Sequence, residues 1–241
     1  MDQLSAEERA RHARFVFAED RRDFAVAHVL LRRMLSIYGR PHDAQSAFER
    51  GPHGKPFLAD GAGDRRAPLF NLAHTRGLVA AVVTHHADVG IDVEPLERGA
   101  DALGLARRYF SGAEVRELER CSGVERDIRF TELWTLKEAF VKATGTGIAN
   151  ELRGCSFTFD GSTSLVFEPA DGAQAGAWAF ALFDVGGYRL AVAVRDTVDN
   201  IEALSVCEHA DADVHGNTPV AGSSARLLRA SPGLVASCSF S

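Results

Sequence analysis

Residues 130–142 read FTELWTLKEAFVK, and this stretch decides the fold of the second half of the chain. At about 100° per residue the segment forms an amphipathic helix. Its broad apolar stripe comprises Phe130, Leu133, Trp134, Phe140 and Val141. Glu138 and Lys142 are four residues apart, so they are neighbours at one edge of the stripe. Lys137 falls inside the stripe, where an ammonium loses its hydration unless it is paired or reaches the surface. We interpret this local inconsistency as a sign of a site.

A strand upstream of the helix carries two carboxylates. The runs 78–83 and 89–93 are apolar and are separated by a short turn-like stretch, which predicts a tight antiparallel hairpin. Because side chains alternate along a strand, the valines and isoleucine of 89–93 share one face. Asp92 and Glu94 project from the other face. We expect one face to pack and the other to present both carboxylates.

These acidic groups suit a hard cation. Magnesium prefers oxygen ligands, so Asp92, Glu94 and Glu138 together could hold it, with Lys142 adding a positive charge nearby. Such a set suits the cleavage of a pyrophosphate linkage, where charge accumulates on the leaving phosphate. Each pair alone also has an ordinary explanation. An exposed glutamate–lysine pair at this spacing stabilises a helix by about 0.2–0.5 kcal/mol, and the two strand carboxylates could simply face solvent.

A histidine precedes the predicted hairpin. His74 lies in the stretch FNLAHTR at residues 70–76, at a polar point between apolar segments. It could donate to a phosphate, although a lone histidine is as readily explained by a structural role.

The remaining pattern predicts helices followed by strands, twice along the chain. Helices are expected within residues 6–38, 103–118 with a break at 111–112, and 126–144, which glycines end. A loop-rich stretch follows the first helical region, with Phe48 in a short strand. Further strands are expected at 155–159, 164–167, 178–183 and 188–194. From about residue 210 the chain lacks sustained periodicity, which indicates a disordered tail.

Composition narrows the function classes. The 241 residues are 46% hydrophobic, enough for a substantial core. The net charge of -6 argues against a general nucleic-acid binder, although arginines gather near the N-terminus and could form a local anion site. The four cysteines lack metal-ligand spacing. No apolar run approaches the roughly 20 residues of a membrane span, so we expect a cytoplasmic protein without membrane or targeting segments.

Four motifs in order resemble the Sfp-type 4'-phosphopantetheinyl transferases. They are GKP at 54–56, FNLAHT at 70–75, GIDVE at 90–94 and WTLKEAFVK at 134–142, within a resemblance over roughly residues 6–195. The resemblance implies an α+β fold of two similar lobes in one chain, a pseudodimer. The lobes would be 1–97 and 98–200, with 201–241 as a disordered tail.

The resemblance implies an activity. The phosphopantetheine arm of coenzyme A would be transferred to a serine of an apo acyl-carrier or peptidyl-carrier protein, releasing adenosine 3',5'-bisphosphate. Asp92, Glu94 and Glu138 would ligate Mg2+. Glu138 would also help to deprotonate the serine, and Lys142 would stabilise the leaving pyrophosphate oxygen. His74 and Lys137 are counted with these catalytic candidates.

The resemblance also implies a coenzyme A site in the cleft between the lobes. The residues expected to bind coenzyme A, beside Lys142, are Arg9, Arg11, Arg14, Gly54, Lys55, Pro56, His74 and Thr75. Within this set the arginines would meet the 3'-phosphate, the GKP residues would line the adenine pocket, and His74 would contact phosphate. A monomer that binds neither nucleic acid nor membrane is expected.

Two positions depart from the family pattern. Ala73 stands where many relatives have a serine, and Asp23 where many have a basic residue. A degenerate, non-catalytic carrier-protein or nucleotide-binding member is therefore an alternative, which the intact acidic residues disfavour. A metal-dependent phosphohydrolase ranks last, because the sequence has no recognised hydrolase motif.

Overall fold

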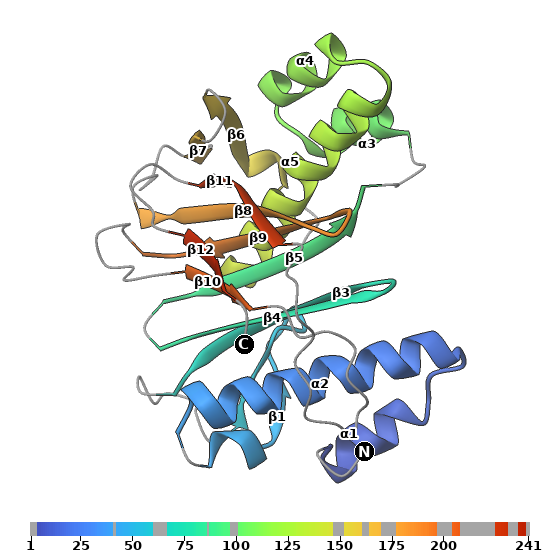
Figure 1. Cartoon of the computed structure of the whole chain (residues 1–241), viewed down its shortest axis with the longest axis vertical. Coiled ribbons are helices and arrows are strands. Elements are labelled where there is room, and N and C mark those ends of the chain that lie inside the picture. The colour runs from blue at the N-terminus through green and yellow to red at the C-terminus, as the bar shows by residue number, and fades with distance from the viewer. Residues whose placement is uncertain are drawn as a thin grey trace.

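Helices form where apolar residues recur at helical spacing. They are α1 (Ala6–His12), α2 (Ala18–Tyr38), α3 (Ala102–Tyr109), α4 (Gly112–Arg120) and α5 (Gly123–Thr144), with single 3-10 turns η1 (Asp43–Gln45) and η3 (Leu152–Gly154). Figure 1 shows the computed structural model. It describes residues 4–40, 42–59, 67–85, 87–96, 101–146, 152–160, 164–169 and 177–196, and the backbone of 204–207, 225–230 and 236–239.

Local chemistry sets the helix boundaries. Ser5 and Glu8 form a capping box at the start of α1, and Ser111 with Glu114 forms another at the start of α4, at the predicted break between helices. Gly145 ends α5 with φ 70°, a left-handed conformation that glycine adopts without steric cost.

Among the described residues, the strands form one large sheet and three two-stranded pairs. The strands are β1 (Phe48–Arg50), β2 (Pro56–Leu58), β3 (Leu69–Thr75), β4 (Leu78–Thr84), β5 (Val89–Pro95), β6 (Cys155–Asp160), β7 (Ser164–Pro169), β8 (Ala179–Val185), β9 (Tyr188–Val194), β10 (Leu204–Cys207), β11 (Ala225–Ala230) and β12 (Ala236–Ser239). The large sheet has the order β5-β9-β8-β11-β7-β6, and the pairs are β1-β2, β3-β4 and β10-β12. The α+β class is therefore confirmed.

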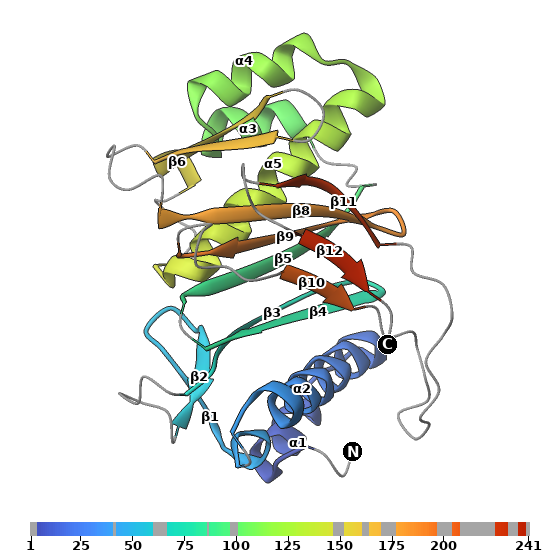
Figure 2. The ribbon, with the colours of Figure 1, turned by 60° about the vertical axis from the view of Figure 1, so that its left-hand side comes forward.

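Three apolar layers hold these elements together. Leu31 and Leu35 of α2 pack with Phe70 of β3, and α2 lies along the β3–β4 hairpin (Figures 1 and 2). The opposite side of that hairpin, including Ala73, packs on the odd-numbered residues of β5 and on β8 and β9. On the other face of the large sheet, α3, α4 and α5 cover a core centred on Phe180. The alternation of faces along β5 is as predicted.

The predicted hairpin between residues 78–83 and 89–93 is wrong. Strand β4 pairs with β3 through a tight turn at Arg76 and Gly77, where Gly77 has φ 86°. Strand β5 pairs antiparallel with β9, with Asp92 opposite Ala191. A two-residue turn containing glycine is a strong hairpin signal, and it favours β3–β4 over β4–β5.

Regular structure also occurs in the segment expected to be a disordered tail. Strand β11 lies in the large sheet, antiparallel to β8 and parallel to β7, and β10 pairs in parallel with β12. Figure 2 shows β10 and β12 beside the large sheet. The expectation of disorder does not hold for these three strands, because strand partners distant in the sequence pair with them and the local pattern does not reveal those partners. The rest of residues 201–241 lies outside the described residues.

Within the described residues, none of the helices combines the length and apolar character needed to cross a bilayer.

Candidate active site

The site is built where helix α5 crosses strand β5. Gly90 lies at the contact, and a Cβ atom at this position would clash with the carbonyl oxygen of Ala139 and the amide nitrogen of Ala143. The absent side chain therefore lets the helix backbone approach the strand closely. Asp92 follows two residues later on the same face of β5, so its carboxylate also faces α5.

An ion pair joins the two elements. Lys142 Nζ lies 2.6 Å from Asp92 Oδ1, with 30% of the lysine side chain and 9% of the aspartate side chain exposed. Asp92 Oδ2 is buried and has no hydrogen-bond partner among the described residues. A buried carboxylate oxygen without a partner is costly. It is the kind of atom that a bound cation would satisfy, so this carboxylate fits a magnesium site.

The other two predicted metal ligands lie on the same elements. Glu94 is half-buried and follows Asp92 on the same face of β5. Glu138 is buried and precedes Lys142 by about one turn of α5. In the part of the chain that the structure describes, no cluster of three or more His, Cys, Asp or Glu side chains is assembled as a metal centre. The structure thus brings Asp92 and Lys142 together, and the full carboxylate set stays a prediction.

Lys137 occupies a different environment. Its side chain and that of Glu114 are fully buried, and their ion pair measures 2.9 Å. Its ammonium also donates to the carbonyl oxygens of Leu152 and Cys155, each at 2.6 Å. The buried charge is paired inside the core of the second half, so it needs no substrate to explain it. These contacts favour a structural role for Lys137, and its catalytic role stays an untested prediction.

His74 and Thr75 lie at the end of β3, where His74 is exposed and Thr75 is half-buried. Neither side chain has a described contact with Asp92 or Lys142. Asn71 of the same motif is buried, and its Oδ1 accepts a hydrogen bond of 3.0 Å from the Ile91 amide. This asparagine links the β3–β4 hairpin to β5. The sequence holds a signal for such a role, because Asn71 is a polar residue within an otherwise apolar strand.

The GKP motif lies in and just after the turn between β1 and β2, and its lysine contacts both β5 and α5. Lys55 Nζ donates to the carbonyl oxygens of Val89 at 3.1 Å and Ala143 at 2.9 Å. Burial lowers the pKa of Lys55, and the charge of Asp88 partly offsets that effect. Gly54 has φ 85° and forms the turn that places the lysine. The ammonium is therefore bound to the protein's own backbone.

The predicted arginines lie in and just after α1. The guanidinium of Arg9 donates to the Leu4 carbonyl, and that of Arg11 lies 5.6 Å from the centre of the Phe24 ring. Arg14 is exposed. Arg50, which the sequence did not suggest, donates to the Gly54 carbonyl at 3.1 Å.

Burial and, to a smaller extent, the charge of Arg11 lower the pKa of Arg50, and the charge of Glu7 partly offsets them.

Asp23, the departure from the family pattern, is buried and lies 3.7 Å from the Nε of Arg22.

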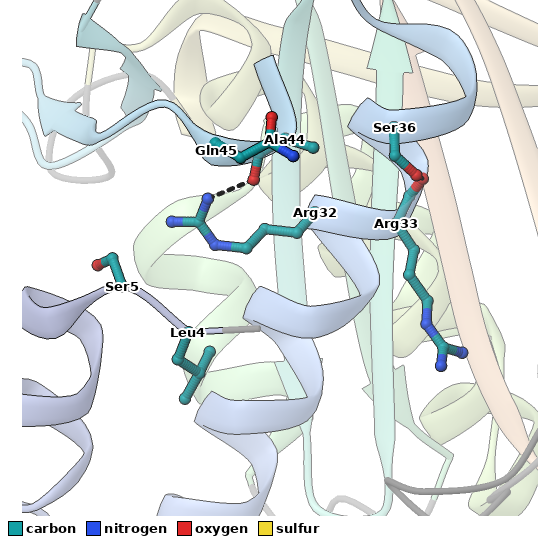
Figure 3. A pocket seen from close by; sticks show the side chains of 7 residues that line it. All are labelled: Leu4, Ser5, Arg32, Arg33, Ser36, Ala44 and Gln45. Carbon is teal, nitrogen blue, oxygen red and sulfur yellow. Dashed lines mark hydrogen bonds between the residues drawn. The ribbon is translucent and has the colours of Figure 1, made fainter. Parts of the chain in front are cut away.

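A separate cleft of about 460 Å³ lies between α1, α2 and η1 (Figure 3). Arg32 at its wall is already bound to Glu8 and to the carbonyls of Ala44 and Ser46. Figure 3 shows Arg33 pointing away from Arg32. None of the residues lining this cleft is a predicted site residue.

Comparison with known proteins accounts for both halves of the chain. A family model described as the 4'-phosphopantetheinyl transferase superfamily matches residues 88–193, which include β5, α5 and the Asp92–Lys142 pair. A second, described as the N-terminal part of 4'-phosphopantetheinyl transferases, matches residues 1–86. The chain belongs to the 4'-phosphopantetheinyl transferase superfamily.

Relatives within the superfamily include enzymes from several bacteria. The chain is 39% identical over 149 residues to the 4'-phosphopantetheinyl transferase HetI of Nostoc sp., covering 61% of each protein. It is 29% identical over 168 residues to the 4'-phosphopantetheinyl transferase Sfp of Bacillus subtilis, covering 68% of this chain and 71% of Sfp.

A phosphopantetheinyl transferase of Thraustochytrium sp. is 30% identical over 190 residues, covering 74% of this chain and 65% of that relative. The chain thus spans less than two thirds of HetI and of the Thraustochytrium relative. Among solved structures, a holo-(acyl-carrier-protein) synthase from Bacillus anthracis in complex with CoA (3',5'-ADP) matches with 19% identity and a TM-score of 0.40, covering 46% of this chain and 96% of that one.

Proposed function

We propose that the protein transfers the 4'-phosphopantetheine arm of coenzyme A to a serine hydroxyl of an apo acyl-carrier or peptidyl-carrier protein. The observation that carries the proposal is the Asp92–Lys142 pair, in which a helix cation and a strand carboxylate meet at 2.6 Å beside an unsatisfied buried oxygen. The names of the relatives support the reaction, since HetI and Sfp are both 4'-phosphopantetheinyl transferases.

The residues of the site have separate tasks in this proposal. Asp92, Glu94 and Glu138 would hold Mg2+, which when bound polarises phosphate oxygens and offsets developing charge. Lys142 is partly exposed beside Asp92, so its ammonium can donate to a substrate phosphate oxygen. Charge-assisted donation of this kind is worth most where charge develops in the transition state.

The reaction balances without any further reactant. The carrier serine oxygen forms a bond to the phosphorus that bears the pantetheine arm, and the bond from that phosphorus to the bridging oxygen breaks. The serine proton passes to the Glu138 carboxylate. The leaving group is adenosine 3',5'-bisphosphate, whose new charge Lys142 stabilises.

We further propose that the chain forms two similar lobes with coenzyme A between them. The first lobe would be residues 1–97, which include α2, the β3–β4 hairpin and β5, and the second would be residues 98–200, which include α5 and β9. The pairing of β5 with β9 and the hydrogen bond from Lys55 to the Ala143 carbonyl support this arrangement, because both join the first lobe to the second.

The decisive experiment combines purified protein, coenzyme A, Mg2+ and a panel of apo carrier proteins, and weighs the carriers by mass spectrometry. A mass gain of one phosphopantetheine on serine is expected, and it should disappear with EDTA and return with added Mg2+. Coenzyme A binding without any carrier modification across the panel would favour the degenerate, non-catalytic alternative.

A matched variant tests the assigned base. Glu138→Gln keeps the shape of a buried side chain while it removes the negative charge and the basicity. Transfer should fall by at least about a hundredfold, the usual scale of a lost general base. Unaltered turnover in a folded Glu138→Gln protein would refute the role of Glu138.

A further inference from the structure

Lys55 lies where three separate elements meet. It follows Gly54 in the turn between β1 and β2, and its ammonium reaches both the start of β5 and the last turn of α5. Its aliphatic stem lies against Gly145, where a Cβ would be 3.6 Å from Lys55 Cδ. One side chain therefore contacts both elements that carry the candidate active site.

The two carbonyls that Lys55 binds are close in sequence to the reacting groups. The Ala143 carbonyl immediately follows Lys142, and the Val89 carbonyl precedes Asp92 by three residues. The last carbonyls of a helix have no partner within the helix, and a cation there satisfies them and complements the helix dipole. A lysine that only capped the helix would need only the Ala143 carbonyl. Because Lys55 also donates to the Val89 carbonyl, it links the end of α5 to the start of β5, and we call this pair of hydrogen bonds the clasp.

We propose that Lys55 is a positioning residue, whose ammonium clasps α5 to β5 and thereby holds Lys142 in register with Asp92 for the transfer reaction. The inference rests on the proposed function for its catalytic part. It also changes the expectation drawn from the GKP motif, in which Lys55 lines the adenine pocket. The two hydrogen bonds to carbonyl oxygens use two of the three donors of the ammonium and direct it at the protein's own backbone.

The test compares Lys55→Met with a matched control in the full chain. Methionine keeps an unbranched stem against Gly145 and removes the ammonium. Tyr188→Phe is the control, because it removes one hydroxyl group that donates a 3.0 Å hydrogen bond to the Arg76 carbonyl. Tyr188 pairs with Pro95, at the end of β5 opposite to Val89. Two readouts are needed, namely amide hydrogen exchange of peptides covering residues 139–146 and the kinetics of carrier modification.

For Lys55→Met we expect exchange at residues 139–146 to be about tenfold faster, the effect of losing one well-made buried hydrogen bond. We expect kcat to fall about tenfold to a hundredfold, because misplacing a reacting group is costly. The KM for coenzyme A should stay within about twofold. Lys55→Arg should recover part of both effects. Tyr188→Phe should leave both at the wild-type values.

Two results would overturn the clasp. A raised KM for coenzyme A with unchanged exchange would make Lys55 a ligand contact, and unchanged values in both assays would make it a surface lysine. If Lys55→Met does not fold, Lys55→Gln, which keeps a donor on a shorter side chain, is measured by the same two readouts. If wild-type protein modifies no carrier, the proposed function fails, and the exchange measurement alone still decides whether the clasp exists.

Discussion

Replacement of Lys137 by methionine separates a structural role from a catalytic one. The ammonium makes a 2.9 Å ion pair with Glu114 and donates to two carbonyl oxygens, and neither side chain is exposed. Breaking a buried ion pair by removing one partner costs about 3–5 kcal/mol, because the other charge stays buried. The two carbonyls lose a donor as well, although such effects do not add.

We therefore expect Lys137→Met to lower the free energy of unfolding by about 4 kcal/mol, a large share of the roughly 5–15 kcal/mol typical of a native protein. With a urea dependence of about 2 kcal/mol/M, the midpoint would fall by about 2 M. Trp134 and Trp178 pack against the same core, so their fluorescence follows the transition.

The double variant Lys137→Met/Glu114→Gln supplies the control. It removes the unpaired carboxylate charge, so it should regain part of the lost stability. It should also keep carrier-modifying activity at temperatures where it is folded. A single variant that loses less than about 1 kcal/mol of stability yet is inactive would refute the structural assignment and restore Lys137 to the catalytic set.

Three further outcomes are expected. Gly90→Ala should destabilise the protein by about 3 kcal/mol or more, seen as a lowered thermal midpoint, because a methyl group has no space against the α5 backbone; an unchanged midpoint would contradict the close packing. Burial alone would raise the pKa of Glu8. Hydrogen bonds from His28 and Ser5 and the charge of Arg32 outweigh burial, so the pKa falls from 4.5 to about 2. This depressed pKa contributes stability above about pH 4.5 that is lost as the pH falls towards 2, up to about 3 kcal/mol, and Glu8→Gln should flatten that part of the acid-unfolding curve. Asp92→Asn should weaken Mn2+ binding measured by electron paramagnetic resonance by about tenfold or more, whereas Lys142→Met should strengthen it, because it frees Asp92 Oδ1 for the cation; tighter binding in Asp92→Asn would exclude this carboxylate as a ligand.

Local patterns predicted the elements that depend on local chemistry. The helix expected at 126–144 is α5, and Gly145 ends it as expected. The alternation along residues 89–93 is also correct, since those odd-numbered side chains pack in one core and Asp92 faces the helix. These features follow from helical and strand periodicity, which a single sequence carries in full.

The pairing of strands that are far apart in the sequence could not be predicted from local patterns. Strand β5 pairs with β9, almost a hundred residues later, and nothing in the apolar pattern of either run specifies the other as its partner. Consecutive strands are usually neighbours, so the prediction joined 78–83 to 89–93. The Arg76–Gly77 turn was the local signal that β4 already had a partner in β3.

The two lysines of α5 have different roles because they point to different sides of the helix. Lys137 and Lys142 are five residues apart, so they point in directions about 140° apart around the helix axis. The first direction leads into the core, where Glu114 is the partner, and the second leads to Asp92 on β5. The helical wheel placed Lys137 in the apolar stripe correctly, but it could not reveal that a carboxylate from α4 would be buried there. The Ser111–Glu114 capping box was visible in the sequence, and it fixes that glutamate at the start of α4. A buried lysine in an apolar stripe is thus better matched first to the carboxylates of neighbouring helices, whereas a lysine that stays partly exposed beside its carboxylate, as Lys142 does, can still reach a substrate.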